Sequence, residues 1–235
     1  MKRIGILGGM SPESTIIYYR ELNAGARAAL GPLESADCLI ASMNFGDIQR
    51  MQKAGDWDGA GALLGRAAKG LQDGGADLVL LATNTMHKCA DAIEAAISVP
   101  FLHIADATGM KLKSDGRTRP LLLGTAYTME QDFYKGRLRQ DHGLEVVIPG
   151  DADRARIHAI IFGELVNGIT TDESRAAYID IVRQHAAAGA DSVILGCTEI
   201  GMLLNDTNSP LPVYDTALIH CEVALEMALG ELRTS

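Results

Sequence analysis

Residues 75–85 read GADLVLLATNT, and residues 189–199 read GADSVILGCTE. In both stretches a Gly-Ala-Asp turn precedes a short apolar run typical of a buried strand, and polar residues follow where that strand would end. A fainter echo pairs IGILG at 4–8 with LLLG at 121–124. The repetition indicates a duplicated α/β lobe.

The rest of the chain alternates runs rich in Val, Ile and Leu with segments of helical periodicity, which predicts an α/β fold with parallel strands. We predict strands at residues 3–8, 37–44, 77–82, 101–104, 120–124, 145–148, 192–196 and 212–214. We predict helices at residues 12–30, 56–73, 86–97, 128–141, 151–167, from 170 to before 189, and at 216–232.

The ends of two helices have clear signals. Ser11-Pro12-Glu13 supplies an N-cap, a proline for the first helical position and an early acid. The stretch TTDE at 170–173 has capping-box spacing, and Gly189 follows the expected end of that helix.

The expected architecture is two pseudo-symmetric lobes, each a parallel sheet with helices on both faces. The first lobe would hold residues 1–98 plus 210–235, and the second residues 99–209. Parallel α/β sheets bind ligands beyond the carboxyl ends of their strands, so we expect both polar trios to face one cleft between the lobes.

Composition narrows the function. The chain has 235 residues, 47% of them apolar, which is enough for a substantial core. Its four cysteines form no CxxC pair and no zinc-ligand spacing, which indicates a reduced cytoplasmic protein without a structural metal. No signal peptide or membrane span is expected. The net charge of −9 and pI near 5.1 argue against nucleic-acid binding.

No motif indicates a nucleotide, a metal or a serine nucleophile. The glycines of residues 5–11 do not follow GxGxxG spacing, and GxxxxGK[ST], HExxH and GxSxG are absent. This opening turn, which includes Met10 and Ser11, and its counterpart at Thr125 could hold a small anion through hydroxyls and backbone N–H groups. A helix cap or turn explains both equally well.

Cys197 is the candidate nucleophile or proton carrier. It follows an apolar strand and precedes Thr198 and Glu199, which could begin a helix. The positive end of a helix dipole lowers a thiol pKa and favours the thiolate. A buried structural cysteine is the alternative, and Cys38, Cys89 and Cys221 keep that interpretation.

The equivalent position of the first lobe is Thr83, followed by Asn84 and Thr85. Asn84 and the backbone N–H groups beyond it could hold a carboxylate, although an ordinary helix N-cap fits as well. Lys88 could favour a ligand carboxylate or be solvated. His87 could carry a proton near neutral pH, or cap or pack on the helix surface.

Several of these stretches together resemble the aspartate/glutamate racemase family. They are IGILGGMS at 4–11, TNTMH at 83–87, PFLHIAD at 100–106, LGTAYTM at 123–129 and GCTEI at 196–200, so the likeness covers essentially the whole chain. It implies two α/β lobes, an active site between them, and racemisation of an amino acid without pyridoxal phosphate or metal. It also implies a homodimer.

Typical members place a cysteine at each of the two strand ends, and the two act on opposite faces of the substrate Cα. The resemblance therefore assigns catalysis to Cys197 and Thr83. Without a cofactor, the carbanion needs donors around the α-carboxylate, a role that falls to Asn84, Thr85 and Thr198. Met10, Ser11, Gln52, Thr125 and Glu199 complete the expected substrate-binding set.

This chain departs from that pattern at Thr83, whose hydroxyl is far less acidic than a thiol. Cys197 would abstract a proton readily, whereas Thr83 would donate or relay one. The expected activity is a slow or strongly directional racemase. An acidic amino acid is the expected substrate, with Arg50 and Gln52 as candidate contacts for its distal group, and neutral or basic amino acids stay open.

Two other functions fit the same residues. One is an isomerase or decarboxylase of a dicarboxylic acid that uses Cys197 alone. The other is a non-catalytic amino-acid-binding protein that kept the cleft after losing one base.

Overall fold

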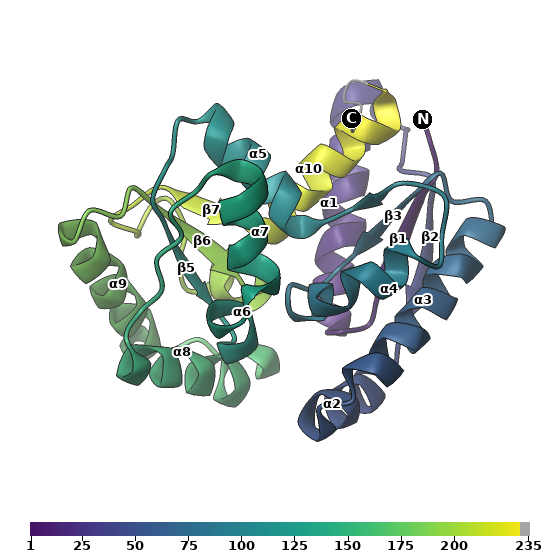
Figure 1. Cartoon of the computed structure of the whole chain (residues 1–235). Coiled ribbons are helices and arrows are strands. Elements are labelled where there is room, and N and C mark those ends of the chain that lie inside the picture. The colour runs from purple at the N-terminus through teal and green to yellow at the C-terminus, as the bar shows by residue number, and fades with distance from the viewer. Residues whose placement is uncertain (231–235) are drawn as a thin grey trace. The chain divides into compact units, whose positions relative to one another are not determined.

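The computed structural model describes residues 1–230 of the chain, which form two compact units. The first unit comprises Met1–Ile104 and the described residues from Ala217 onward, and the second is Ala105–Thr216. Each unit is a parallel sheet flanked by helices (Figure 1), so the predicted α/β class is confirmed.

The sheet of the first unit has the strand order β2-β1-β3-β4, and every neighbouring pair is parallel. Its strands are β1 (Ile4–Gly8), β2 (Cys38–Ser42), β3 (Leu78–Leu81) and β4 (Phe101–Leu102). All residues of β1 and β3 are buried, as expected for central strands covered on both faces.

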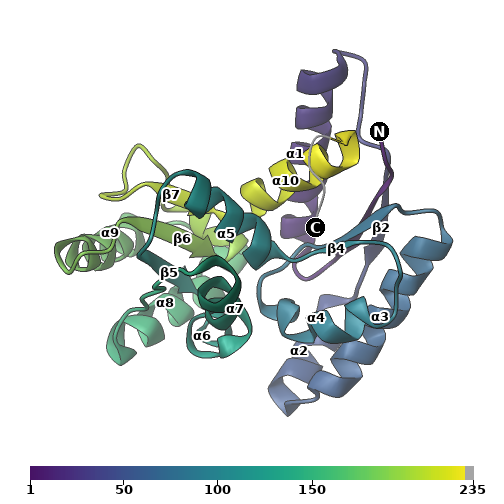
Figure 2. The ribbon, with the colours of Figure 1, turned by 45° about the horizontal axis from the view of Figure 1, so that its top comes forward.

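Helices cover both faces of this sheet. On one side lie α1 (Pro12–Leu30) and α10 (Thr216–Leu229), and on the other α3 (Trp57–Asp73) and α4 (Ala90–Glu94), as Figure 2 shows. The α3 side forms an apolar core in which Leu64 and Ala68 join Leu7 and Leu81 of the strands. The short helix α2 (Phe45–Ala54) follows β2, and a 3₁₀ helix, η1 (Thr85–Cys89), follows β3.

The sheet of the second unit has the order β5-β6-β7, with β5 (Pro120–Gly124), β6 (Ser192–Gly196) and β7 (Val213–Asp215), again all parallel. Val147 adds a single parallel bridge beside Leu121, at the free edge of β5. The bridge occupies the place that β2 holds beside β1, so the two units share one strand plan.

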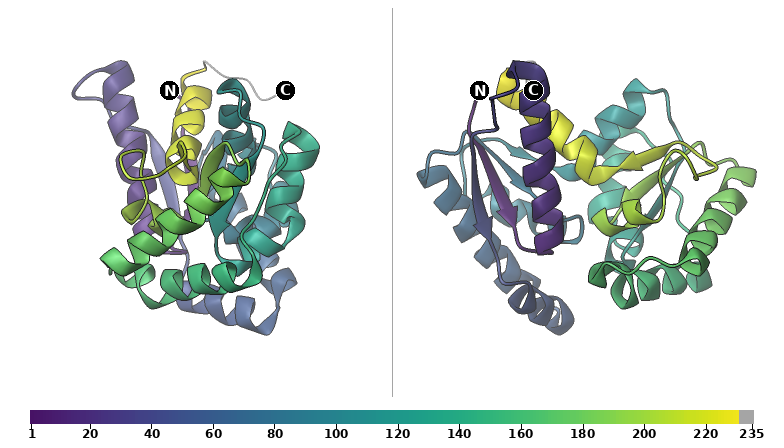
Figure 3. Two further views of the ribbon diagram at one scale, coloured as in Figure 1. Left: turned by 90° about the vertical axis from the view of Figure 1, so that its left-hand side faces the viewer. Right: turned by 180° about the vertical axis from the view of Figure 1, so that it is seen from behind.

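The helices of the second unit can be followed from behind and from the side in Figure 3. They are α5 (Ile104–Ser114), α6 (Ala126–Glu130), α7 (Asp132–His142), α8 (Asp151–Gly163) and α9 (Asp172–Ala187), with 3₁₀ turns η2 (Leu165–Asn167) and η3 (Thr198–Met202). None of the helices within residues 1–230 is long and apolar enough to span a membrane.

The chain passes between the units at two equivalent points. It leaves the first unit after β4, at the start of α5, and returns after β7, at the start of α10. The last strand was expected in the first lobe, within residues 210–235. That assignment is wrong, because β7 pairs with β6 of the second sheet, and only α10 returns.

Both crossing helices are anchored by polar contacts. On α5, Asp106 accepts two hydrogen bonds of 2.7 Å from Arg137 and one of 3.2 Å from His142. Burial opposes ionisation of this carboxyl, but the hydrogen bonds from His142 and Arg137 hold its pKa below the usual value. On α10, the buried His220 donates from Nε2 to the Leu102 carbonyl at 2.9 Å and accepts at Nδ1 from the Tyr18 hydroxyl at 2.7 Å.

The Gly-Ala-Asp echo is a structural repeat. Gly75 and Gly189 have positive φ angles of 94° and 93°, a conformation that other residues adopt at a cost. Asp77 accepts the backbone N–H of Arg3 at 2.7 Å, and Asp191 accepts that of Arg119 at 2.9 Å. Each turn therefore attaches the start of one central strand to its neighbour.

Several predicted elements differ from the structure. The single helix expected at 86–97 is η1 followed by α4, the one expected at 128–141 is split into α6 and α7, and the one expected at 151–167 ends as η2. The expected strand at 145–148 is only the bridge at Val147. Helices α2 and α5 were not predicted. The N-cap of α9 is Thr171. The end of the last predicted helix, at 231–232, lies outside the described residues.

Candidate functional site

The site residues of the first unit follow two neighbouring strands. β1 and β3 are parallel and in register, with Leu7 opposite Leu81, so their carboxyl ends lie at one edge of the sheet. Met10 and Ser11 come after β1, and residues 83–85 come after β3. The pairing of β1 with β3 therefore places these two predicted segments side by side.

The trio after β3 is buried. Thr83, Asn84 and Thr85 expose 9%, 4% and 9% of their surface. Asn84 stands at the start of η1 but makes no side-chain capping hydrogen bond, so the ordinary N-cap explanation does not apply to it. The Asn84 side chain is buried with Thr83 and Thr85 just beyond the carboxyl end of β3.

His87 is a packed, buried side chain, which was one of its two interpretations, and not an exposed proton carrier. Its ring is 2% exposed, with Nδ1 2.7 Å from the Thr83 carbonyl and Nε2 accepting from the Ile104 N–H at 3.1 Å. Lys88 lies with its ammonium 4.1 Å from the centre of the Trp57 ring, a cation–π contact. These contacts give both residues local structural partners.

The opening turns after β1 and β5 both cap helices. The Ser11 hydroxyl accepts the Ser14 N–H at 3.3 Å, and the Thr125 hydroxyl accepts the Thr128 N–H at 3.3 Å. A hydroxyl that accepts a capping bond still carries a hydrogen to donate, so capping and ligand binding are compatible. Met10 is buried in the apolar core of its unit.

In the second unit, Cys197 follows β6 directly and lies beside Thr125, because Gly124 of β5 is in register with Gly196 of β6. The Cys197 thiol donates to Glu199 Oε2 at 2.9 Å. The Thr198 hydroxyl donates to the same oxygen at 2.8 Å. A thiol, a hydroxyl and a carboxylate thus lie together at the carboxyl end of β6.

The expectation that a helix dipole lowers the Cys197 pKa is wrong. Burial raises this pKa well above its ordinary value near 9, and the charge of the Glu199 side chain and its hydrogen bond with the thiol raise it further, against a smaller lowering by the Glu199 backbone N–H. Asp215, at the end of the neighbouring strand β7, acts in the same direction. The helix after Cys197 is only the five-residue η3, and these nearby acids outweigh its dipole. Cys197 therefore rests as a thiol.

The candidate contacts for a distal substrate group are engaged locally. Gln52 Nε2 lies 2.9 Å from the sulfur of Met86, and the exposed Arg50 pairs with Asp47. On the other unit, Glu164 accepts the Ser174 hydroxyl at 2.7 Å. Arg50 and Gln52 lie on α2, and Glu164 follows α8. Neither place has a buried cation, so neither indicates that the side chain of the substrate is acidic.

The other three cysteines, all within residues 1–230, form no disulfide bond. Cys89 and Cys221 are buried and Cys38 is half-buried. Burial raises the Cys89 pKa to about 11. Within residues 1–230, no group of three or more His, Cys, Asp or Glu side chains is placed to hold a metal ion.

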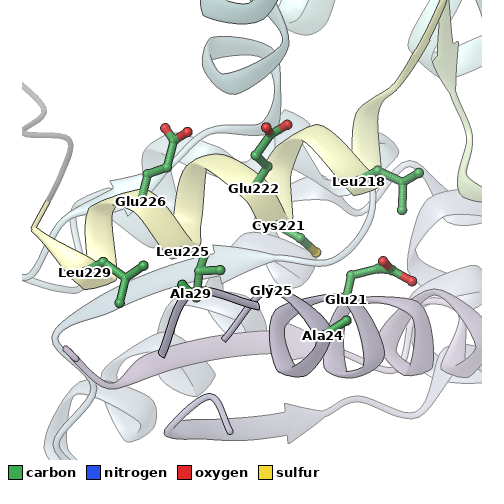
Figure 4. Close-up of a pocket in the computed structure, with 10 residues that line it drawn as sticks. All are labelled: Glu21, Ala24, Gly25, Ala29, Leu218, Cys221, Glu222, Leu225, Glu226 and Leu229. Atoms are coloured by element: carbon green, nitrogen blue, oxygen red, sulfur yellow. The ribbon is translucent and has the colours of Figure 1, made fainter. Parts of the chain in front are cut away.

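A hollow of about 290 Å³ lies elsewhere, between α1 and α10. Leu218, Leu225 and Leu229 line it together with Glu21 and Glu222 (Figure 4). It contains none of the predicted site residues, so this hollow is separate from the strand ends.

Asp215 was not singled out from the sequence. It ends β7, the strand next to β6, and its carboxylate contributes to the raised Cys197 pKa. Tyr178 of α9 is a second neighbour: burial raises its pKa, and its interactions with the Cys197 and Glu164 side chains raise it further. Asp215 directly follows the predicted strand 212–214, which was a detectable signal, whereas nothing in the sequence linked Tyr178 to this thiol.

The geometry can be compared with known proteins. The family model of the Asp/Glu/hydantoin racemases matches residues 7–224, nearly the whole chain. The chain belongs to this family. It is therefore an isomerase of the racemase class.

Individual relatives agree with this assignment. The structure of a proposed Asp/Glu racemase from Yersinia pestis is 48% identical and superimposes with a TM-score of 0.93, covering 97% of this chain and 100% of that one. An aspartate racemase homologue from Pyrococcus horikoshii OT3 is 34% identical, with a TM-score of 0.86 and the same coverage. The broad specificity amino-acid racemase RacX of Bacillus subtilis (strain 168) is 26% identical over 91% of this chain and 92% of its own length.

Proposed function

We propose that this racemase acts on amino acids without a cofactor, with Cys197 and Thr83 as the two residues that exchange protons with Cα. The observation that carries the proposal is the pair of equivalent strand ends. Each unit presents a proton-bearing side chain directly beyond its central strand, a thiol in one and a hydroxyl in the other. Inversion of a stereocentre requires one such group for each face.

In this mechanism Glu199 prepares Cys197. The thiol is protonated at rest, so it becomes a base only after its proton moves to an acceptor. Glu199 Oε2, at 2.9 Å, is that acceptor. The thiolate then removes the Cα proton, and the reprotonated thiol returns one in the reverse reaction. Asn84, Thr85 and Thr198 serve the substrate carboxylate as hydrogen-bond donors, with Ser11 and Thr125 beside them.

Thr83 makes the two faces unequal. Within the described residues of its own unit, its hydroxyl makes no hydrogen bond to a carboxylate that would take its proton, and an alkoxide is inaccessible at neutral pH. Thr83 can therefore give its proton to the carbanion only as another proton reaches its oxygen from solvent, so that no alkoxide is left, and its face exchanges protons slowly in both directions. The enantiomer whose Cα–H faces Cys197 loses that proton quickly, and its carbanion is usually reprotonated on the same face before it inverts.

The equilibrium between the enantiomers limits which measurement can reveal the difference in proton exchange between the Cys197 face and the Thr83 face. An amino acid with one stereocentre has an equilibrium that favours neither enantiomer, so kcat/KM for inversion must be equal in both directions. The difference appears instead as isotope exchange into the recovered substrate, which is fast for one enantiomer and slow for the other.

We infer that the substrate is an acidic amino acid. The support is that two relatives are described as aspartate or Asp/Glu racemases or their homologues. The relative RacX has broad specificity, and Arg50 is already paired with Asp47, which keeps neutral and basic amino acids in the assay. A homodimer, which the family resemblance implies, and a cytoplasmic location, which the scattered cysteines indicate, belong to the same proposal.

The test is a chiral assay of all common amino acids in deuterated buffer. The expected result is inversion with deuterium at Cα for at least one acidic amino acid. Absence of both inversion and exchange for every amino acid, at enzyme concentrations where a slow racemase would register, contradicts the proposal.

A second function is favoured by the protonated state of Cys197. A thiol that only protonates a carbanion suits an isomerase or decarboxylase of a dicarboxylic acid, which needs no base at position 83. Turnover of maleate or an arylmalonate, without Cα exchange of amino acids, supports that function. Tight amino-acid binding without either reaction indicates a binding protein.

A further inference from the structure

The hydrogen bonds of His87 fix its tautomer. A carbonyl oxygen only accepts and a backbone N–H only donates, so Nδ1, 2.7 Å from the Thr83 carbonyl, carries the hydrogen. Nε2, 3.1 Å from the Ile104 N–H, is the acceptor. A second proton on this ring would point Nε2–H at the amide hydrogen. The geometry therefore holds His87 neutral.

The ring joins two functionally distinct points of the first unit. Thr83 lies just past the end of β3, where the ladder to β1 has stopped. Ile104 is the first residue of α5 and the last of the first unit, at the point where the chain passes to the second. The rings of His103 and Phe101, 4.4 Å and 5.7 Å away, pack against the imidazole. His87 therefore links Thr83 to Ile104 through two hydrogen bonds, which we call the His87 bracket, and is not a mobile proton carrier.

The donated bond acts on the backbone of the residue proposed to exchange protons. Threonine is β-branched, so its χ1 has few choices and its hydroxyl direction follows its backbone. A displacement of about 1 Å in a reacting group can cost roughly 10²-fold in rate. Whatever fixes the Thr83 carbonyl therefore fixes the position of the Thr83 hydroxyl.

We propose that His87 is a positioning residue for Thr83, and that its Nδ1–H···O=C hydrogen bond sets the direction of the Thr83 hydroxyl toward the substrate. The inference rests on the proposed role of Thr83 in proton exchange. It extends that role to a buried side chain that does not itself touch the substrate.

Two substitutions separate the two hydrogen bonds. In His87→Asn the amide nitrogen can take the place of Nδ1 and still donate to the Thr83 carbonyl. In His87→Gln the longer amide can place its oxygen near Nε2 and accept from Ile104, while the bond to Thr83 is lost. His185 is a matched control, because its Nδ1 lies 2.8 Å from the Ile181 carbonyl four residues earlier, in α9 of the other unit.

The measured quantities are deuterium exchange on the Thr83 face and on the Cys197 face. We expect His87→Gln to slow the Thr83 face by about tenfold or more and the Cys197 face by no more than about twofold. His87→Asn should recover most of the lost rate, and His185→Gln should change neither face. Equal loss on both faces, or a larger loss in His87→Asn than in His87→Gln, overturns the proposal.

A second measurement does not depend on activity. Nitrogen-15 NMR of the imidazole should show the Nδ1–H tautomer of His87 unchanged from about pH 5 to 8, the range in which an ordinary histidine titrates. An Nε2–H tautomer or a protonated ring overturns the bracket. If the wild type shows no exchange while the NMR result holds, the proposed function has failed and the contacts of His87 have not.

Discussion

The strands β3 and β6 occupy equivalent positions in the two sheets, but the side chains that follow them differ: Thr83 follows β3 and Cys197 follows β6. After β6, a thiol donates to the carboxylate of Glu199, two residues later. After β3, a hydroxyl stands at the position of the thiol, and Thr85 stands at the position of Glu199. The duplicated strand plan therefore puts one proton-bearing group at the equivalent strand end of each unit, and the neighbouring side chains make the two groups chemically different.

The largest expected effect is that of Cys197→Ala. It should lower both inversion and exchange by about 10³-fold or more, because position 83 has no independent base. The measurement is deuterium incorporation at Cα from each enantiomer. Cys38→Ala, which changes another partly exposed thiol, is the control. Retention of more than a tenth of the activity in Cys197→Ala would show that the thiol is not the proton carrier.

Next in size is Glu199→Gln, which should slow exchange on the Cys197 face by about 10²-fold by removing the proton acceptor. It should also move the pH profile. In the wild type the thiol proton passes to Glu199, so exchange should depend little on pH near neutrality. Without the carboxylate the thiol must lose its proton to solvent, and burial keeps the Cys197 pKa raised, so exchange should rise with pH.

The pH profiles of wild type, Glu199→Gln and the exposed-surface control Glu222→Gln separate two roles. A lower rate with an unmoved profile would mean that Glu199 supports the structure without acting on the thiol. An unchanged rate would remove it from the mechanism.

Thr83→Cys should make the two strand ends more alike. A thiol at position 83 offers a stronger base, so exchange from the enantiomer facing that position should rise by about tenfold, and inversion should rise in both directions together. Thr83→Ser, which keeps a hydroxyl, is the control and should resemble the wild type. A Thr83→Cys variant that folds and binds substrate but exchanges no faster would show that position 83 does not limit the reaction.

The smallest effects test the duplication itself. Gly75→Ala and Gly189→Ala place a side chain at φ near +94° and +93°, which should cost about 1 kcal/mol of unfolding free energy in each case. Chemical denaturation of both variants measures this cost. Costs that differ by several kcal/mol would mean that the two turns do not play the same structural part.

The sequence predicts the repeat because its signals are local. Apolar runs, the Ser11 cap and the glycines with positive φ depend on neighbouring residues alone, and the strands adjoining Thr83 and Cys197 follow from them. Helix α5 was missed because its sequence, IADATGMKLKS, contains Thr108 and Gly109 and has no capping signal. Its stability comes from contacts such as that of Asp106 with Arg137, which lie far apart in sequence.

The chemistry of the candidate site is less accessible to sequence. The sequence repeat and the family resemblance could single out Cys197 and Thr83 as candidates, but the direction of the Cys197 pKa depends on burial, on Glu199 and on Asp215 from another strand. The bracket formed by His87 likewise depends on the position of Ile104, brought close by the fold. Such contacts join residues whose separation in sequence carries no periodic signal.

In the proposed mechanism a thiol and a hydroxyl of unequal basicity serve the two faces of one amino acid. The most direct measurement is the initial rate of deuterium incorporation into recovered substrate, compared with the rate of inversion, for each enantiomer separately. We predict that one enantiomer exchanges much faster than it inverts, while the other acquires deuterium almost only in the inverted product. Equal incorporation into both recovered enantiomers would contradict the account.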